Sequence, residues 1–409
     1  MRRTTLTSVL SAATVALLAA ACGTSAGTST GTGSGGASGS GATRARPPAM
    51  TPLAALGAGE GAVNILAWAG YAENGSTDKA VDWVTPFEKA TGCKANVQVA
   101  NTSDEMFEKM GTGTFDVVSA SGDSSLRMVY AGKVAPVNTA LLTNYADVPA
   151  FEKDRTWNSV DGVSYGMPHG WGAQLMAYRT DKVNPAPDSW SVVWDPSSPY
   201  AGKITDYDSP VDGIGAAAVY LMSTKPELGI KNPYALDQKQ LDAAIALLQA
   251  QKPTVGAYWA SYTDAQKALE AGTTVVGSTW QIIVNLATAD KAPVASVLPK
   301  EGATGWADTW MLDAKSPHPN CAYQWMNWAT KADVQAQIAE WFGEAPANTK
   351  ACALTTDKGH CDTYHAADEA YFSKLWFWTT PQSDCVDGRT DVKCTAYSDW
   401  SKAWSSLRS

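Results

Sequence analysis

The chain has 409 residues, 45% of them hydrophobic, which is enough for two domains of typical size. Only 17% of the residues are charged, and acidic residues outnumber basic ones by 40 to 31. Phosphate binding needs a basic surface, so this balance argues against nucleic acid as a partner and favours a cationic or neutral small ligand. The 17 tryptophans can supply flat platforms for such a ligand, although most tryptophans in proteins are core residues.

The first 22 residues have the pattern of a bacterial lipoprotein signal. Met1-Arg2-Arg3 is basic, residues 6–20 are apolar, and small residues lead up to Cys22. This predicts a signal peptide at 1–21, cleavage before Cys22 and lipidation of the Cys22 thiol. A plain signal peptide that ends in cysteine is the alternative.

The residues that follow favour the lipid anchor. Residues 23–43 are only Gly, Ser, Thr and Ala, a composition that cannot bury a core and that behaves as a flexible tether. We expect this tether to extend over 22–62. No later segment is long and apolar enough to span a membrane. The protein is therefore predicted to sit on the extracellular face of the cell membrane, held there by lipid alone.

From Val63 onward, apolar runs of strand length alternate with segments that have helical spacing. A strand is predicted at 63–68, followed by a helix at 78–90 that stops at Gly92. Strand–helix–strand alternation is typical of a parallel sheet covered by helices, so we predict an α/β fold. Further strands are predicted at 94–100, 115–118 and 273–277, and helices from Ser103 and over 214–222, 265–271 and 320–342.

The same alternation predicts two lobes. We place 63–167 plus 298–350 in the first lobe and 168–297 plus 351–409 in the second. Two α/β lobes joined by crossing strands leave a cleft, and ligands bind at the carboxyl ends of the strands in such sheets. We therefore look for function where strands end.

One motif suggests an enzyme. Gly162-Val163-Ser164-Tyr165-Gly166 matches the G-x-S-x-G pattern of serine hydrolases, which requires a buried strand before the serine and a helix directly after it. Residues 158–161 are mostly polar, and Pro168, Gly170 and Gly172 disfavour a helix. We expect no enzyme activity.

The cysteines predict disulfides. Once Cys22 is assigned to lipid, six remain, an even number suited to an oxidising compartment. Six cysteines can pair in about 15 ways, so the connectivity stays open. Equal separations favour Cys352–Cys361 and Cys385–Cys394, which leaves Cys93–Cys321.

The histidines do not indicate a metal. His360 and His365 lie near Cys361 and Asp362, so a zinc site can be imagined. The spacing matches no structural zinc pattern, and Cys361 has a disulfide partner available. We also find no phosphate-binding glycine loop, and we expect no cofactor.

Aromatic residues and acids gather where the predicted strands end. Trp306, Asp308 and Trp310 alternate as in a strand, which places them on one face. Tyr207-Asp208-Ser209-Pro210-Val211-Asp212 puts two carboxylates on a turn before an apolar helix, although an acid in the first turn of a helix is often only a cap. Trp68 and Trp280 also follow strands.

From residue 63 to its end, the chain resembles the extracellular spermidine/putrescine-binding proteins of ABC importers. The match covers nearly all of the expected fold, and its most specific element is Trp-x-Asp after P-K-E-G. The matching segments are A-W-A-G-Y (67–71), D-V-V-S-A-S (116–121), Y-G-M-P-H-G-W-G-A (165–173), T-D-Y-D-S-P-V-D (205–212), V-G-S-T-W (276–280) and P-K-E-G-A-T-G-W-A-D (299–308).

The resemblance implies a two-lobed fold of the periplasmic-binding-protein type (type II). It also implies aromatic rings that box the ligand's methylene chain and carboxylates that hold its ammonium ends. Trp310 matches nothing in the family's site, and we assign it to the core. The residues that the resemblance implies for ligand binding are Trp68, Tyr71, Ser121, Asp208, Asp212, Trp280, Trp306, Asp308 and Tyr364.

Three departures bear on the ligand more than on the class. Ala120-Ser121-Gly122 lacks the family's aromatic residue, Asp212 is shorter than the glutamate often found there, and the cysteine-rich segment 352–394 is not a general family feature. Another organic amine and a sugar remain alternatives, although a sugar site has no need for three convergent carboxylates. A ferric-ion site would need clustered tyrosines. We expect a monomeric protein that passes a polyamine to the permease and ATPase of an ABC importer.

Overall fold

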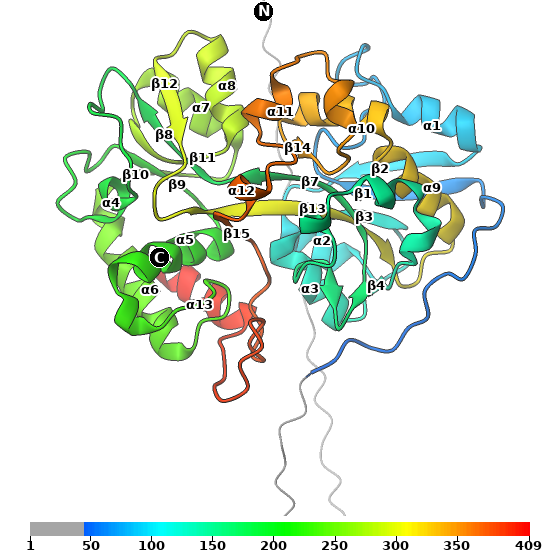
Figure 1. Ribbon diagram of the computed structural model, residues 1–409, viewed down its shortest axis with the longest axis horizontal. Helices are drawn as coiled ribbons and strands as arrows, with labels where there is room; N and C mark the ends of the chain where they lie inside the picture. The colour runs from blue at the N-terminus through cyan, green and yellow to red at the C-terminus, as the bar shows by residue number, and fades with distance from the viewer. Residues whose placement is uncertain (1–44) are drawn as a thin grey trace, which may run out of the picture. The chain divides into compact units, whose positions relative to one another are not determined.

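The structure is a computed structural model that describes residues 45–409 (Figure 1). The predicted signal peptide, Cys22 and the first half of the predicted tether lie outside these residues. Residues 45–409 belong to one unit that contains two large β-sheets. Within residues 45–409, no helix is long and apolar enough to cross a membrane.

The first sheet has eight strands and is mixed in direction. β1 pairs in parallel with β2 and β3, whereas β13 runs antiparallel to β3 and β7. The α/β prediction is therefore confirmed, but a purely parallel sheet is not what forms. In spatial order the strands are β14 (Ala345–Pro346), β7 (Met167–Ala173), β13 (Ala303–Asp313), β3 (Val117–Ser121), β1 (Ala62–Ala67) and β2 (Lys94–Val99), with β4 (Val134–Ala135) and β15 (Leu375–Phe377) also paired to β13.

The second sheet has five strands and continues directly from the first. Only Gln174 separates β7 from β8, and a short turn separates β12 from β13. Two segments that were predicted in the second lobe pair instead with β13 of the first sheet. They are residues 168–173, which belong to β7, and β15. In spatial order the strands are β10 (Val255–Trp259), β9 (Ile204–Tyr207), β11 (Val276–Thr279), β8 (Leu175–Arg179) and β12 (Val294–Val297).

Helices cover both sheets (Figure 1). Those associated with the first sheet include α1 (Val84–Thr91), α2 (Ser103–Lys109), α3 (Gly122–Tyr130), α9 (Pro319–Ala329), α10 (Ala332–Phe342), α11 (His360–Thr363) and α12 (Glu369–Phe372). Those associated with the second include α4 (Ser191–Trp194), α5 (Pro210–Thr224), α6 (Gln238–Gln251), α7 (Tyr262–Ala271), α8 (Gln281–Ala289) and α13 (Tyr397–Arg408).

Two predicted helices differ from the observed ones. The helix predicted at 78–90 begins only at Val84, which places Pro86 in the first turn, where proline is tolerated. If the helix began at residue 78, Pro86 would lie in its interior, where its ring clashes with the preceding turn. The helix predicted at 320–342 is broken at Thr330 and Lys331, where the Thr330 hydroxyl donates to the Met326 carbonyl.

The described part of the predicted tether is held by the folded chain. The Glu60 carboxylate accepts hydrogen bonds from the backbone amides of Asn320 and Cys321 at the start of α9, at 3.0 and 2.9 Å. Leu53 packs on the core beside β1, and its carbonyl accepts from the Asn138 side chain. The tether boundary predicted at residue 62 therefore lies too late in the chain.

All three predicted disulfides form. Cys93–Cys321 joins the end of α1 to α9 across 228 residues, whereas Cys352–Cys361 and Cys385–Cys394 each close a separation of 9 residues. Cys352–Cys361 holds α11, the helix that leads into Tyr364. The long-range disulfide ties the two ends of the first-lobe chain together, as the spacing suggested.

Candidate ligand-binding site

The central element of the site is β13, which crosses the middle of the structure beside β7 (Figure 1). All 11 of its residues are buried. Trp306 and Asp308 face the loop after β1 and the end of α10: Phe342 lies 5.7 Å from the Trp306 ring and 4.4 Å from the Tyr71 ring. The alternation in the sequence therefore placed these side chains correctly.

Two glycines of β7 make room for this face. Gly172 lies opposite Trp306 and Gly170 lies opposite Asp308. A Cβ atom at Gly172 would lie 2.5 Å from the Trp306 ring, and one at Gly170 would lie 2.4 Å from the Glu344 carboxyl carbon. Only residues without a side chain allow the indole and this carboxyl group to lie flat on the strand.

Asp308 lies at the centre of a buried hydrogen-bond network. The Tyr71 hydroxyl lies 2.8 Å from its Oδ2, and Ser121 is its partner across the ladder with β3. The Trp68 indole N–H in turn donates to the Ser121 hydroxyl at 3.1 Å. The structure thus brings four predicted site residues together, from three separate chain segments. The other oxygen of Asp308, Oδ1, is buried and has no hydrogen-bond partner.

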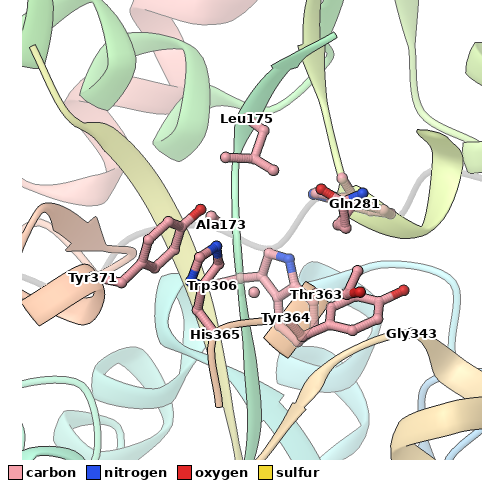
Figure 2. Close-up of a pocket in the computed structure, with 11 residues that line it drawn as sticks. Ala173, Leu175, Gln281, Trp306, Gly343, Thr363, Tyr364, His365 and Tyr371 are labelled. Atoms are coloured by element: carbon pink, nitrogen blue, oxygen red, sulfur yellow. The ribbon is translucent and has the colours of Figure 1, made fainter. Parts of the chain in front are cut away.

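A pocket opens beside Trp306 (Figure 2). Trp280, Trp306 and Tyr364, all predicted site residues, form part of its lining, and the space between the lining residues is about 320 Å³ counted out to open solvent. Asn285 orients Tyr364 by donating to its hydroxyl at 3.1 Å. The other lining residues are Gly172, Ala173, Leu175, Gln281, Gly343, Thr363, His365 and Tyr371.

Asp212 contributes a second buried carboxyl group. It lies in the first turn of α5, where Ser209 is the N-cap, but its own carboxyl is not a cap. Its Oδ1 accepts hydrogen bonds from the Thr304 hydroxyl on β13 and from the Trp378 indole, at 2.6 and 3.1 Å. Its Oδ2 is buried without a partner.

The acids converge on an aromatic cluster beside the pocket. The Tyr207 ring lies 5.3 Å from Trp280 and is stacked 5.9 Å from Trp378. Burial raises the pKa of the Tyr207 phenol, and the nearby carboxyl groups of Asp123, Asp212, Asp208 and Asp308 raise it further. Negative charge and aromatic faces therefore meet in one region, which is the environment that attracts an organic cation.

Asp208 is oriented differently from the other predicted acids. Its Oδ1 accepts from the Trp404 indole at 3.0 Å, and its Oδ2 pairs with the Arg408 guanidinium at 3.2 Å. Both partners belong to α13. Asp208, like Asp308 and Asp212, is not among the residues that line the pocket. Its charge is thus already compensated by the protein, and a role in ligand binding stays a prediction.

Burial controls the ionisation of the two other carboxyl groups. It raises the pKa of Asp308 to about 7, against the opposing effect of the neighbouring Ser121 and Tyr71 hydroxyls. It also raises the pKa of Asp212 to about 7, which Thr304 and Trp378 oppose. Within residues 45–409, no lysine or arginine forms an ion pair with either group. A bound cation would supply that missing charge.

Several residues near the site were missed from the sequence. Glu344 is fully buried beside Tyr71, Trp378 holds Asp212, and His365 stacks on Tyr371 at 3.6 Å. All three lie in the segment after β13, where no strand was predicted, although Trp378 directly follows β15. The one available signal was the pair of glycines on either side of Trp171. Glycines at alternate positions leave one face of a strand without side chains, and other side chains can pack there.

The two rival sites do not form. Ser164 lies in the two-residue strand β6 (Val163–Ser164), paired with β5 (Ser159–Val160), and β7 rather than a helix follows it. Its hydroxyl donates to the Gly166 carbonyl. Cys361 is in a disulfide and is not free as a zinc ligand, and the described residues contain no group of three or more His, Cys, Asp or Glu side chains placed to hold a metal.

Fold and site together define a class of protein. Two α/β sheets joined by crossing strands, with an aromatic-lined pocket and buried carboxyl groups near it, form a two-lobed solute-binding protein. Residues 82–363 match the family of bacterial extracellular solute-binding proteins, and the chain belongs to that family.

Individual proteins extend this comparison. The chain is 26% identical over 272 residues to the spermidine/putrescine-binding periplasmic protein of Escherichia coli K12, covering 66% of this chain and 74% of that one. It is 25% identical over 335 residues to the putrescine-binding periplasmic protein of the same organism, covering 74% and 82%. The solved spermidine/putrescine ABC transporter substrate-binding protein of Streptococcus pneumoniae has the same fold, with a TM-score of 0.66, 18% identity and coverage of 85% of this chain and 99% of that one.

Proposed function

We propose that this protein captures a polyamine of the putrescine or spermidine type and delivers it to the permease and ATPase of an ABC importer. The observation that carries this proposal is the pair of buried carboxyl groups, Asp308 and Asp212, each with one oxygen that has no partner. Buried charges require a counter-charge, and here the ligand supplies it. The names of the relatives in Escherichia coli support the same ligand class.

The aromatic residues complete the recognition of a diamine. The rings of Trp280, Trp306 and Tyr364 offer apolar faces to a methylene chain and π-faces to an ammonium group. A cation over such a ring contributes about 0.5–2 kcal/mol, and a hydrogen bond to a charged group about 1.5–3 kcal/mol. Two or three of each, less the cost of association, correspond to a Kd of about 1 μM or tighter.

In this proposal the protein performs no chemistry. It acts as a monomer attached to the extracellular face of the cell membrane through lipid on Cys22. The basic, apolar and small-residue regions of residues 1–21 support this attachment, as does the cysteine that follows them. Metabolic labelling with a fatty-acid analogue tests the anchor: label in the wild type but not in Cys22→Ala is expected, and equal label in both contradicts it.

Calorimetric titration tests the ligand class. We expect heat of binding with putrescine or spermidine and none with a neutral sugar or with an amino acid. Trp306→Ala should weaken amine binding by about threefold to tenfold, as expected for loss of one cation–π contact. Trp341→Ala, at a tryptophan that is 40% exposed on α10, is the matched control. Absence of heat with any di- or triamine would rule out the polyamine assignment.

A further inference from the structure

The Tyr71 hydroxyl lies between two buried carboxyl groups. Its oxygen is 2.8 Å from Asp308 Oδ2 and 2.8 Å from Glu344 Oε2. A phenol has one hydrogen to donate, and an ionised carboxylate can only accept. Both contacts can be hydrogen bonds only if one carboxyl group carries a proton and donates it to the phenol oxygen.

The surroundings of Glu344 identify it as the protonated partner. Its side chain is fully buried, and within residues 45–409 no lysine or arginine forms an ion pair with it. Burial raises its pKa well above the usual range, and the charge of Asp308 raises it further. Burial also raises the pKa of Asp308, to about 7, but the neighbouring Ser121 and Tyr71 hydroxyls oppose that rise.

His169 fixes the direction of the network. The Trp310 indole can only donate, and it lies 2.9 Å from His169 Nδ1, so Nδ1 is an acceptor. Burial holds the pKa of His169 at about 3, so the ring is neutral and carries its hydrogen on Nε2. That Nε2 faces Glu344 Oε1 at 3.4 Å, and the contact is therefore not an ion pair despite its geometry.

The donors then run one way through the network. His169 faces Glu344 Oε1, Glu344 donates from Oε2 to the Tyr71 oxygen, and Tyr71 donates to Asp308 Oδ2. This leaves Asp308 Oδ1, which has no partner in the protein, to meet a ligand. The titratable groups that face Glu344 from all sides are Tyr71, Asp308, His169, Glu152, Tyr364 and, at its backbone carbonyl, His360.

We propose that Glu344 is a positioning residue that stays protonated and turns the Tyr71 hydroxyl toward Asp308, so that Asp308 alone carries the charge that meets the ligand's ammonium group. This inference rests on the proposed amine-binding function. With Glu344 neutral, the pair Asp308 and Glu344 carries a single negative charge. That charge matches one ammonium group of the ligand. An ionised Glu344 would add a second buried charge with nothing to compensate it.

Two variants of nearly equal size test this role. Glu344→Gln can still donate to Tyr71 and place its carbonyl oxygen opposite His169 Nε2, and we expect it to keep amine affinity within about threefold of the wild type. Glu344→Met fills the same space but cannot donate, so we expect a loss of about tenfold or more, as for a hydrogen bond to a charged group. In a Tyr71→Phe background the two variants should bind alike. Equal melting temperatures would show that both fold.

Infrared spectroscopy gives a measurement that needs no ligand. The difference spectrum between the wild type and Glu344→Gln at neutral pH should contain the carbonyl band of one protonated carboxyl group, with and without putrescine. A carboxylate band in its place, or a Glu344→Gln variant that loses amine affinity as strongly as Asp308→Asn, would overturn the proposal. If the wild type binds no amine, the proposed function fails, while the spectrum still decides the protonation of Glu344.

Discussion

Asp308 combines features that rarely occur together in a side chain with only a structural role. It is 3% exposed, it has no basic partner among residues 45–409, and one of its oxygens makes no hydrogen bond. Desolvation of such a group costs free energy that the folded protein does not recover by itself. A ligand cation recovers it, so the cost is a direct source of affinity.

Asp308→Asn tests this residue. We expect amine affinity to fall by more than tenfold, because a neutral amide cannot replace the charge. The melting temperature should stay near that of the wild type, since the amide still accepts from Tyr71. Asp242→Asn, at an acid exposed on α6, is the control and should bind normally. A large loss of stability in Asp308→Asn would instead indicate a structural role.

The pKa of this carboxyl group predicts a pH dependence of binding. Asp308 and Asp212 each have a pKa of about 7 without ligand, and an amine binds their ionised forms. Affinity should therefore fall as the pH drops from 8 to 5. Below pH 7, calorimetry in two buffers of different ionisation enthalpy should detect proton release on binding. An affinity that is constant from pH 5 to 8 contradicts the assigned role of both acids.

At the scale of elements, β7 shapes the site because two of its residues have no side chain. Gly170 and Gly172 leave space on one face for Glu344 and Trp306, while Trp171 between them packs into the core of the opposite face. The site thus depends on the register between β7 and β13, which pairs each glycine with a site residue. A register shift by one residue would bring Trp171 onto this face.

Gly172→Ala tests the register argument. A methyl group 2.5 Å from the Trp306 ring must displace it, and overpacking of this kind costs about 1–3 kcal/mol in the free energy of unfolding. We expect a lower melting temperature and weaker amine binding. Gly57→Ala is the control, because its Cβ atom would meet Asn320 only at 3.4 Å. Unchanged binding in Gly172→Ala would mean that the position of the Trp306 ring does not matter.

The disulfides differ in the length of chain that they close. In the loop-closure model, the separation of 228 residues at Cys93–Cys321 gives about 3 kcal/mol more stabilisation than the separation of 9 residues at Cys385–Cys394. Replacing both cysteines of the long-range pair by serine should therefore lower the melting temperature more than replacing the short-range pair. Amine binding at a temperature where both variants are folded should be unaffected.

At the scale of the whole molecule, the site acids make the unliganded protein sensitive to pH. The folded-state pKa values of Asp308 and Asp212 lie at about 7, above the ordinary aspartate pKa of 3.8. A group whose pKa is raised by folding stabilises the protein fully below its unfolded pKa, and this contribution is lost as the pH rises through its folded pKa. The site therefore opposes folding most strongly at neutral and alkaline pH, where it is ready to bind.

Thermal unfolding should show both effects. Without ligand, these two acids lower the melting temperature as the pH rises from about 4 to 7. At 100 times the Kd, an amine should add about 2.7 kcal/mol to the free energy of unfolding. At a fixed amine concentration the increase should be larger at pH 8 than at pH 5. An increase of equal size at both pH values would show that binding does not require the ionised acids.

Much of this protein follows from local sequence patterns. The alternation of Trp306, Asp308 and Trp310 predicted their common face, and Trp310 is indeed in the core, fully buried. Equal cysteine separations predicted the disulfides, and strand–helix alternation predicted the α/β class. The common face, the α/β class and the two short-range disulfides depend on the period of the backbone and on nearby residues, so the sequence alone determines them. The Cys93–Cys321 pair spans 228 residues and was predicted only as the pair that the other two leave.

The partner of each site acid was decided only by the tertiary structure. Tyr71 reaches Asp308 across 237 residues and Glu344 across 273, whereas Asp208 meets Arg408 across 200. Asp208 directly follows a strand and Asp308 lies within one. Nothing in the sequence around either residue shows that the charge of Asp208 is compensated and that of Asp308 is not. A periodic pattern specifies which way a side chain points. Whether its charge is compensated depends on which distant segment packs there, and this is what separates a structural carboxylate from one that binds a ligand.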